Sequence, residues 1–351
     1  MRISKIRSLG NGISLAGDFL VDEVDYVLGR FLPDSLQDYI TAKRESRGVT
    51  PRVDRVLRER ILEQVITPYT EWKRASSLRD WNDLATSLAE RSVEPPYDIL
   101  IADETQDFSA NEVRAIRNQL APEHSLTFVL DSAQRIYARG FNWSEVGIAV
   151  GSENIKRLTK NYRNTVEIAR LAKGLLNGVP VDDDGTLPDL NACSRHGRVP
   201  ILLEGGFAEQ MRYAVTYIRS NVNLKKESIA FLHPLGGGWF RHVRESLDRA
   251  KIQYVELTRQ SEWPEGDENV ALSTLSSAKG LEFDHVIILG LNAEVTHHGD
   301  DEDDDGLMRL RKLLAMGITR ARESVILGYK GQDASRLVHY LEQNTFEAIR
   351  L

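Results

Sequence analysis

The chain has 351 residues, which is enough for two domains of ordinary size. Lysine and arginine number 45 against 52 aspartates and glutamates, so the formal net charge of −7 provides no overall basic field for nucleic acid, although a local basic groove would suffice. A single cysteine excludes an intrachain disulfide and no apolar run approaches the ~18 residues of a membrane span, so we expect a cytoplasmic protein with no signal peptide and no membrane contact.

Residues 1–95 are predicted to form a mostly helical segment. From about residue 19 to residue 91 the apolar residues recur at helical spacing, as in VDRVLRERILEQVITPYTEW (53–72). Strand-like runs are few in this part of the chain. We therefore expect it to be an accessory segment that lies before the sheets.

From Tyr97 onwards, short apolar runs alternate with amphipathic stretches. DILIADE (98–104) is followed by SANEVRAIRNQL (109–120) and then by LTFVLDS (126–132). Strands that alternate with helices predict a parallel sheet with helices on both faces. Residues 96–176 are expected to form one such α/β region.

A polar stretch at 177–199 is rich in glycine, proline, aspartate and asparagine, which predicts a linker or surface loop. Residues 200–351 then repeat the alternation of strands and helices, beginning with PILLEGG at 200–206. The predicted fold class is α/β, with two parallel-sheet halves on either side of the linker.

Two carboxylates, Asp103 and Glu104, follow the first predicted strand directly. Open α/β sheets place their ligand sites at the carboxyl ends of strands. In nucleotide hydrolysis one such carboxylate can hold Mg²⁺ while its neighbour orients and deprotonates the attacking water. An acidic pair at a strand end can also be purely structural.

Five segments together resemble the motor core of the UvrD/Rep family of superfamily 1 DNA helicases. They match its motifs II to VI in identity, order and approximate spacing. In chain order they are YDILIADETQDF (97–108), LTFVLDSAQRIY (126–137), LTKNYRNT (158–165), LSTLSSAKGLEFDHVII (272–288) and LLAMGITRAR (313–322). The resemblance implies RecA-like sheets of the P-loop NTPase helicase type, ATP and Mg²⁺ as cofactors, and DNA that is single-stranded or has a 3′ tail as partner.

The same resemblance implies catalytic roles for four residues. Glu104 would activate the attacking water and Gln134 would sense the terminal phosphate. Arg163 and Arg320 would both reach the γ-phosphate. A planar cation at the developing phosphate charge can contribute about 10³ to 10⁵ in rate.

Nucleotide binding is implied for a second set of residues. Asp103 would be the Mg²⁺ ligand, Tyr162 would stack on the adenine and Glu282 would bond the ribose. Gly280, with no Cβ atom, would let the backbone approach the ligand closely.

Nucleic-acid binding is predicted for an aromatic loop and for the SSAKG segment. Tyr137, Phe141 and Trp143 lie among arginines, and such aromatic faces suit unstacked bases, each stack being worth ~1 to 3 kcal/mol. The same aromatics can instead pack between the domains. Ser276 stands where the family often has histidine, but its hydroxyl can still reach a phosphate, and Lys279 offers a cation.

The sequence contains no Gly-x-x-x-x-Gly-Lys-Ser/Thr loop, which holds the nucleotide phosphates in such motors. We therefore expect an incomplete first RecA-like domain with an uncovered sheet edge, and self-association or rearrangement to cover it. Three interpretations stay open. The chain is part of a 3′-to-5′ DNA helicase or translocase that is inactive alone, or half of a split motor that a partner chain with the phosphate loop completes, or a non-catalytic scaffold for nucleic acid or protein.

One acidic segment is not interpreted as a metal site. His297 and His298 stand beside GDDEDDDG (299–306), but consecutive histidines point in different directions. A solvated loop is the expected structure for such a charge run.

Overall fold

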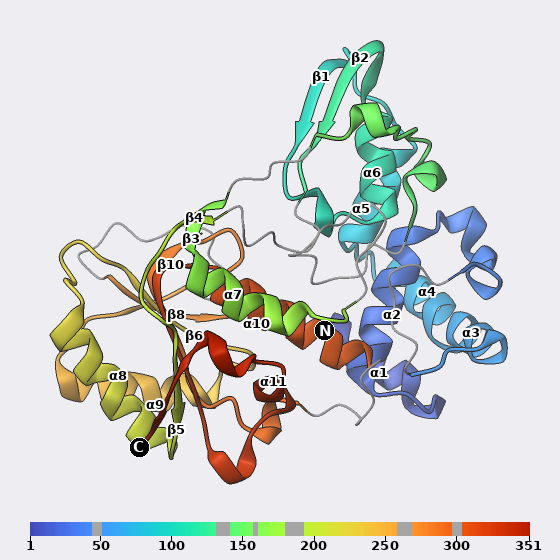
Figure 1. The fold of residues 1–351 in the computed structure, drawn as a ribbon. Coiled ribbons are helices and arrows are strands. Elements are labelled where there is room, and N and C mark those ends of the chain that lie inside the picture. The colour runs from blue at the N-terminus through green and yellow to red at the C-terminus, as the bar shows by residue number, and fades with distance from the viewer. Residues whose placement is uncertain (44–50, 131–140, 157–160, 180–192, 258–268, 297–303) are drawn as a thin grey trace. The chain divides into compact units, whose positions relative to one another are not determined.

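The computed structural model describes residues 1–43, 51–130, 141–156, 161–179, 193–257, 269–296 and 304–351 (Figure 1). The chain divides into two compact units. The N-terminal unit contains residues 1–157 and 301–306, and the C-terminal unit contains residues 158–300 and 307–351.

The N-terminal unit begins with helices, as the apolar spacing predicts. Their bounds are α1 (Arg2–Leu9), α2 (Gly17–Arg30), α3 (Arg55–Ile61), α4 (Thr67–Ala75) and α5 (Trp81–Ala89). A π-helical segment (Leu62–Ile66) joins α3 to α4, and a 3₁₀ segment (Pro33–Ile40) follows α2. The predicted helical segment is confirmed.

Apolar side chains at helical spacing build the core of this helical part. On α2 the residues Leu20, Val24 and Val27 are fully buried, and Ile61 and Tyr69 from the α3–α4 stretch pack in the same cluster. The helices are therefore held together mainly by burial of one apolar stripe each.

The α/β part of the N-terminal unit contains one strand–helix–strand crossover. Strands β1 (Tyr97–Ala102) and β2 (Leu120–Phe128) pair in parallel, with Leu100 opposite Leu126 and Ala102 opposite Phe128. Helix α6 (Ala110–Arg117) lies between them in sequence and begins with a capping box from Ser109 and Glu112. Among the described residues, β1 and β2 form a sheet of two strands.

The C-terminal unit contains a seven-stranded sheet in the order β11-β5-β10-β9-β6-β8-β7, and every pairing is parallel. The strands are β5 (Ile201–Glu204), β6 (Ile229–His233), β7 (Val255–Glu256), β8 (Val270–Thr274), β9 (Phe283–Ile288), β10 (Ala321–Tyr329) and β11 (Glu347–Arg350). The predicted α/β fold class with a parallel sheet is confirmed.

Helices cover both faces of this sheet (Figure 1). Helices α8 (Phe207–Asn221) and α9 (Gly238–Ala250) lie on one face, whereas α7 (Val166–Leu176) and α10 (Asp305–Ile318) lie on the other. A short helix α11 (Arg336–His339) precedes β11. All five residues of β6 are buried as a consequence. No helix among the described residues is long and apolar enough to cross a membrane.

The boundary between the units differs from the predicted linker at 177–199. Strand β3 (Asn161–Thr165) and helix α7 belong to the C-terminal unit, where β3 pairs in parallel with β4 (Cys193–Arg195). The buried side chain of Asn164 donates hydrogen bonds to the backbone of the segment around β10 and so fixes β3 there. Residues 180–192 of the predicted linker lie outside the described residues.

Candidate nucleotide site

Three charged side chains from separate segments meet in the C-terminal unit. Arg163 on β3 pairs through Nη2 with Oε1 of Glu282, the residue before β9. Arg322 on β10 donates to Oε2 of the same carboxylate from Nε at 3.1 Å and from Nη2 at 2.6 Å. The side chains of Arg163, Glu282 and Arg322 are 34%, 27% and 50% exposed, so the cluster remains open to solvent.

Strand pairing explains why these residues meet. In the β9–β10 pairing Ala321 is opposite Phe283, and the backbone N–H of Phe283 donates to the oxygen of Arg320 at 2.9 Å. Glu282 and Arg322 are therefore neighbours at the beginning of two adjacent strands. The side-chain oxygen of Asn161 accepts from the N–H of Arg163 at 3.1 Å and so shapes the turn that presents this arginine.

The electrostatics of the cluster favour an anion. Burial opposes ionisation of Glu282, but hydrogen bonds and charge from Arg322 and Arg163 outweigh it and lower the pKa of this carboxyl. The carboxylate in turn raises the pKa of Arg322. Two guanidinium groups thus share one carboxylate, and the buried Nε of Arg163 donates to no acceptor among the described residues. Within these three residues two positive charges face one negative charge, and guanidinium groups suit a phosphate, although Asp284 and Glu323 also act on Arg322.

Arg320 lies next to this cluster but is buried, with 2% of its surface exposed. Its Nε is 3.2 Å from Sδ of Met316 on α10, and its Nη1 donates to the oxygen of Leu281 at 3.5 Å. The structure therefore brings Arg320 to the residue that precedes Glu282. That its guanidinium reaches a γ-phosphate remains a prediction.

The loop after β8 carries the other predicted residues of this unit. Gly280 has φ +80°, a backbone conformation that favours glycine, while a Cβ atom built there would meet nothing within 4 Å. Glycine is therefore required at this position by the backbone and not by lack of space. Ser276 is exposed and Lys279 is half-buried. Tyr162, beside Arg163, is 71% exposed, so its ring is accessible to a base.

The predicted acidic pair lies in the N-terminal unit, at the carboxyl end of β1. Asp103 and Glu104 are both exposed, and Oδ1 of Asp103 accepts from the N–H of Glu104 at 2.8 Å. Glu104 has φ 54° and ψ 30°, a left-handed conformation that is uncommon for a residue with a Cβ atom. Such local strain is often found at functional sites, which is consistent with a catalytic role.

Gln106 was not singled out from the sequence. It is 1% exposed, and its Nε2 donates to Oε2 of Glu104, so it orients that carboxylate. The only signal in the sequence is its place two residues after Glu104 in ADETQDF.

The donor set at this strand end fits a magnesium ion held jointly with a nucleotide. Mg²⁺ is usually bound by one or two carboxylates together with waters and substrate phosphates. Asp103 and Glu104 supply such a pair, and the described residues contain no group of three or more histidine, cysteine, aspartate or glutamate side chains that would hold a metal by itself. His297 and His298 lie outside the described residues.

The predicted aromatic loop is only partly described, because Gln134 and Tyr137 lie outside the described residues. Phe141 is 2% exposed and packs with Ala110 and Val113 in a small core of the N-terminal unit. Trp143 is half-buried in the same core. A ring buried in this way offers no face to a base, so Phe141 does not fit the predicted stacking role in this structure, and packing accounts for it.

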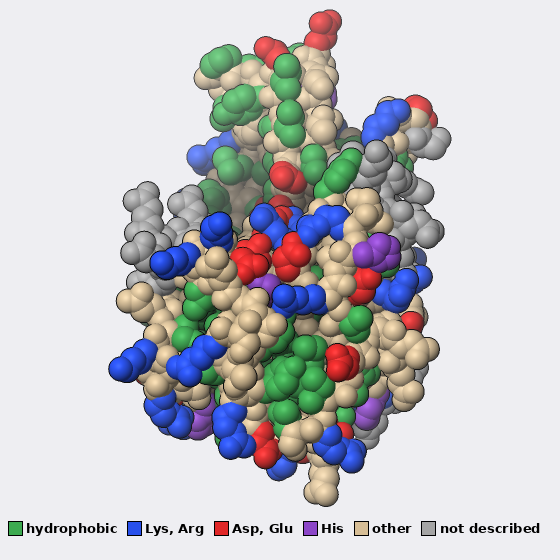
Figure 2. Space-filling view, turned by 60° about the vertical axis from the view of Figure 1, so that its left-hand side comes forward, with side chains coloured by type: hydrophobic (Ala, Val, Ile, Leu, Met, Phe, Trp, Pro, Cys, Tyr) green, Lys and Arg blue, Asp and Glu red, His purple; other side chains and the backbone are tan. Residues whose placement is uncertain are grey.

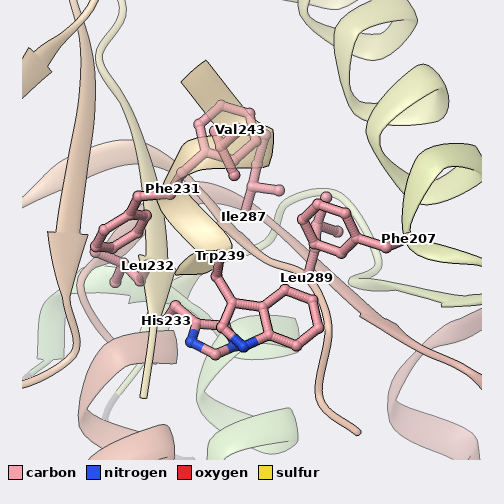
Figure 3. A pocket seen from close by; sticks show the side chains of 9 residues that line it. Phe207, Phe231, Leu232, His233, Trp239, Val243, Ile287 and Leu289 are labelled. Atoms are coloured by element: carbon pink, nitrogen blue, oxygen red, sulfur yellow. The ribbon is translucent and has the colours of Figure 1, made fainter. Parts of the chain in front are cut away.

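A small apolar pocket lies at the carboxyl end of β6 in the C-terminal unit (Figure 3). Its polar lining residue, His233, stacks on Trp239 with ring centroids 4.7 Å apart. Nδ1 of His233 already accepts hydrogen bonds from the N–H groups of Leu235 and Gly236, at 3.1 and 3.2 Å. We therefore attribute this pocket to packing between the sheet and α9.

Residues 242–332 match the family of UvrD-like helicase C-terminal domains. This part of the chain is similar to such domains. It includes Ser276, Lys279, Gly280, Glu282 and Arg320 among the residues that the motifs single out. The resemblance inferred from the motifs, to the C-terminal portion of a UvrD/Rep-type helicase, is confirmed.

Curated relatives agree with this family. A protein named "Probable DNA helicase" from Mycoplasma pneumoniae is 25% identical over 243 residues, which cover 65% of this chain and 42% of the relative. An "ATP-dependent DNA helicase Rep" from Buchnera aphidicola subsp. Schizaphis graminum is 33% identical over 87 residues, 25% of this chain and 12% of the relative. The chain thus spans less than half the length of these relatives.

The solved structures that are similar to the chain include the C-terminal domain of a possible DNA helicase from Lactobacillus plantarum, with a TM-score of 0.40 and 20% sequence identity. The match covers 53% of this chain and 98% of that one.

Proposed function

We propose that this chain is the carboxy-terminal part of an ATP-dependent, 3′-to-5′ DNA helicase or translocase of the UvrD/Rep type, working in the cytoplasm. The observation that carries the proposal is the meeting of Arg163, Glu282 and Arg322 from three separate segments. A domain that only packs has no need for two arginines around one half-buried carboxylate beside an exposed tyrosine.

Each part has a place in such a reaction. MgATP, when bound, would supply the phosphoryl group that is transferred to water. Glu104, oriented by Gln106, would take the proton of the attacking water, and Asp103 would hold the metal. Arg163, once released from Glu282, would stabilise charge on the terminal phosphate, and Arg320 would assist it.

DNA is the proposed partner, bound as a single strand or next to a 3′ tail. Ser276 and Lys279 lie in the loop after β8 and are proposed to contact its phosphates. Trp143, which is half-buried, and Tyr137 are proposed to contact its bases.

Hydrolysis by the chain alone is not expected. The carboxylates and arginines cannot replace the backbone cradle and lysine that position the β- and γ-phosphates, and the 351 residues contain no such loop. The proposal is therefore that the motor is complete only together with this loop, whether the loop lies in the same protein or in a partner chain. The test is DNA-stimulated phosphate release by the chain mixed with the phosphate-loop half of a UvrD/Rep-type helicase. Release that depends on both polypeptides and on Arg163 supports the proposal, whereas an inactive mixture contradicts it.

The second candidate is a non-catalytic scaffold that binds DNA or protein. The missing phosphate loop favours it. A scaffold would bind single-stranded DNA equally well with Arg163→Ala or Glu104→Gln, and it would release no phosphate when mixed with the complementing half.

A further inference from the structure

Arg322 is the member of the charged cluster for which the motifs imply no role. It lies on β10 and donates two hydrogen bonds to Oε2 of Glu282, at 3.1 and 2.6 Å. Arg163 pairs with the other oxygen, Oε1. The carboxylate of Glu282 is therefore divided between two arginines, one on each oxygen.

The two arginines are held differently. Its hydrogen bond to Glu282 raises the pKa of Arg322, and the nearby charges of Asp284 and Glu323 act in the same direction. Acidic and basic side chains lie side by side in this way across the middle of the face that Figure 2 shows. Arg163 instead forms its ion pair through Nη2 and leaves its buried Nε without an acceptor among the described residues. Arg163 is thus the partner that leaves Glu282 more readily.

The backbone of Arg163 is fixed on both sides. Its N–H donates to the side-chain oxygen of Asn161 at 3.1 Å, and its backbone oxygen accepts from Nη1 of Arg195 at 3.4 Å. The next residue, Asn164, is buried and bonded to the segment around β10. A change of partner at Arg163 is therefore a side-chain rotation on a fixed backbone, which partly exposed side chains make readily.

We propose that Glu282 is a latch, which holds Arg163 while no nucleotide is bound and releases it when the hydroxyl groups of a nucleotide sugar bond to Oε1 instead. Arg322 is the positioning residue of this latch, because it occupies Oε2 and so limits Arg163 to one oxygen. This role rests on the proposed function and adds to it the step that frees Arg163 for the terminal phosphate.

The sugar is the part of a nucleotide that suits this carboxylate. Tyr162, the residue before Arg163, is 71% exposed and offers its ring to a base. The sugar lies between the base and the phosphates, and its hydroxyl groups can donate hydrogen bonds, which an ionised carboxylate accepts. A phosphate is itself an anion, so it attracts Arg163 and is repelled by Glu282. One nucleotide can therefore bond to Oε1 through its sugar and bind the released arginine through its phosphate.

Arg322 keeps the latch weak. An arginine that has a carboxylate to itself frequently binds both oxygens, and such a bidentate pair is stronger than a single bond. With Oε2 occupied, Arg163 makes a single contact that a hydroxyl group can replace. Removal of Arg322 should therefore tighten the hold on Arg163. A residue that only supported Glu282 would loosen this hold when removed.

The first experiment measures how fast Arg163 reacts with phenylglyoxal, a reagent for guanidinium groups, in the full chain without nucleotide. Peptide mass spectrometry gives the rate. Glu282→Gln, which keeps the size of the side chain but not its charge, should raise the rate at Arg163 by about threefold to fivefold, as loss of an exposed ion pair would. Arg322→Ala should lower the rate at Arg163 below that of the wild type. Arg322→Lys should restore the wild-type rate, because lysine can still donate to Oε2.

The matched control is Arg244, whose Nη1 is 2.6 Å from Oε1 of Glu256 in an ion pair of similar exposure in the same unit. The rate at Arg244 should be the same in all three variants, and circular dichroism should show them folded. The latch is overturned if Glu282→Gln leaves the rate at Arg163 unchanged. The role of Arg322 is overturned if Arg322→Ala raises that rate.

The second experiment compares ATP with 2′,3′-dideoxy-ATP in DNA-stimulated phosphate release by the chain mixed with the phosphate-loop half of a UvrD/Rep-type helicase. Without sugar hydroxyl groups the latch stays closed, so kcat should fall by about threefold to fivefold. KM should stay within about twofold, because the hydroxyl bond that is lost and the Arg163 bond that is kept offset each other. A sugar contact without a latch predicts a higher KM with kcat unchanged, and this result overturns the latch.

The latch and the motor fail separately. The expected labelling rates, in a chain that releases no phosphate in the mixture, support the latch and contradict the motor. Phosphate release supports the motor and overturns the latch if dideoxy-ATP changes only KM, or if Glu282→Gln leaves the labelling of Arg163 unchanged.

Discussion

The side-chain amide of Asn164 donates a hydrogen bond to the backbone oxygen of Ala321 at 2.7 Å, and a second to that of Thr319 at 2.8 Å. These bonds join β3 to the beginning of β10, where Arg322 lies. Because Arg163 is the residue before Asn164, the same bonds hold Arg163 within reach of Glu282. A buried amide, and not the charges themselves, therefore sets the geometry of the cluster.

Asn164→Ala should lower the free energy of unfolding of the C-terminal unit by about 2 to 3 kcal/mol, because it leaves two backbone oxygens without their donor. Asn164 is 3% exposed, so water does not readily replace the amide. Urea denaturation measures this change. Asn221→Ala is the control, because the exposed Asn221 makes one side-chain bond to Tyr217, and it should change stability by less than ~0.5 kcal/mol. A loss at Asn164 no larger than at Asn221 would contradict the structural role.

The two arginines that the motifs assign to the γ-phosphate should contribute differently to the stability of the protein when no nucleotide is bound. Arg320 is 2% exposed and packs on Met316, so Arg320→Ala should cost about 2 to 4 kcal/mol of stability through lost packing and polar contacts. Arg163 is 34% exposed, and Arg163→Ala should cost less than ~1 kcal/mol, as exposed ion pairs do. Thermal denaturation of both variants measures which one loses more stability. Equal losses of stability would show that Arg320 is not the buried residue described.

The sequence predicts candidate site residues and strands, but it does not predict the division into units. Asp103 and Glu104 could be proposed because they directly follow an apolar strand, whereas Arg163 and Glu282 were proposed from the resemblance to the helicase motifs. Six of the seven strands of the C-terminal unit could be anticipated because buried parallel strands are mostly apolar runs, whereas β11, which is the largely exposed EAIR, contains no such run. The unit boundary could not be anticipated, because β3 and α7 have the same strand–helix pattern as the elements on either side. Long-range hydrogen bonds, such as those of Asn164 and the bond from Arg311 to Leu175 at the end of α7, assign them to the C-terminal unit.

Side-chain burial was the second property that could not be predicted from the sequence. An aromatic residue beside arginines is equally suited to a base or to a core, and only packing decides that Phe141 is buried. Gln106 was missed for a related reason, since its role depends on the conformation of Glu104, which no local pattern specifies.

The C-terminal unit should lose stability in mild acid because of His233. Burial lowers the pKa of His233 from 6.5 to about 4. Between these values the unfolded chain binds a proton that the folded chain does not, so stability is full above pH 6.5 and falls as the pH drops towards 4. The contribution of His233 between pH 7 and pH 5 should be about 2 kcal/mol.

His233→Asn should remove this contribution. Its side-chain oxygen can replace Nδ1 as acceptor for the N–H groups of Leu235 and Gly236, but it does not titrate. Urea denaturation at several pH values measures how steeply the free energy of unfolding changes with pH. His242→Asn, on the exposed side of α9, should keep the wild-type slope. If His233→Asn also kept it, protonation of His233 would not be the cause.

In the chain completed by a phosphate-loop polypeptide, Glu104→Gln should abolish turnover while nucleotide affinity stays within about twofold, because it removes water activation and leaves the metal ligand Asp103. Gln106→Ala should lower kcat and leave KM nearly unchanged, since Gln106 only orients the carboxylate of Glu104. Steady-state phosphate release with single-stranded DNA measures both effects. Glu123→Gln, an exposed carboxylate on β2 of the same unit, is the control and should be silent. Turnover that persists in Glu104→Gln, or that Glu123→Gln reduces equally, would show that the acidic pair at the end of β1 does not activate water. The scaffold would then be the better interpretation.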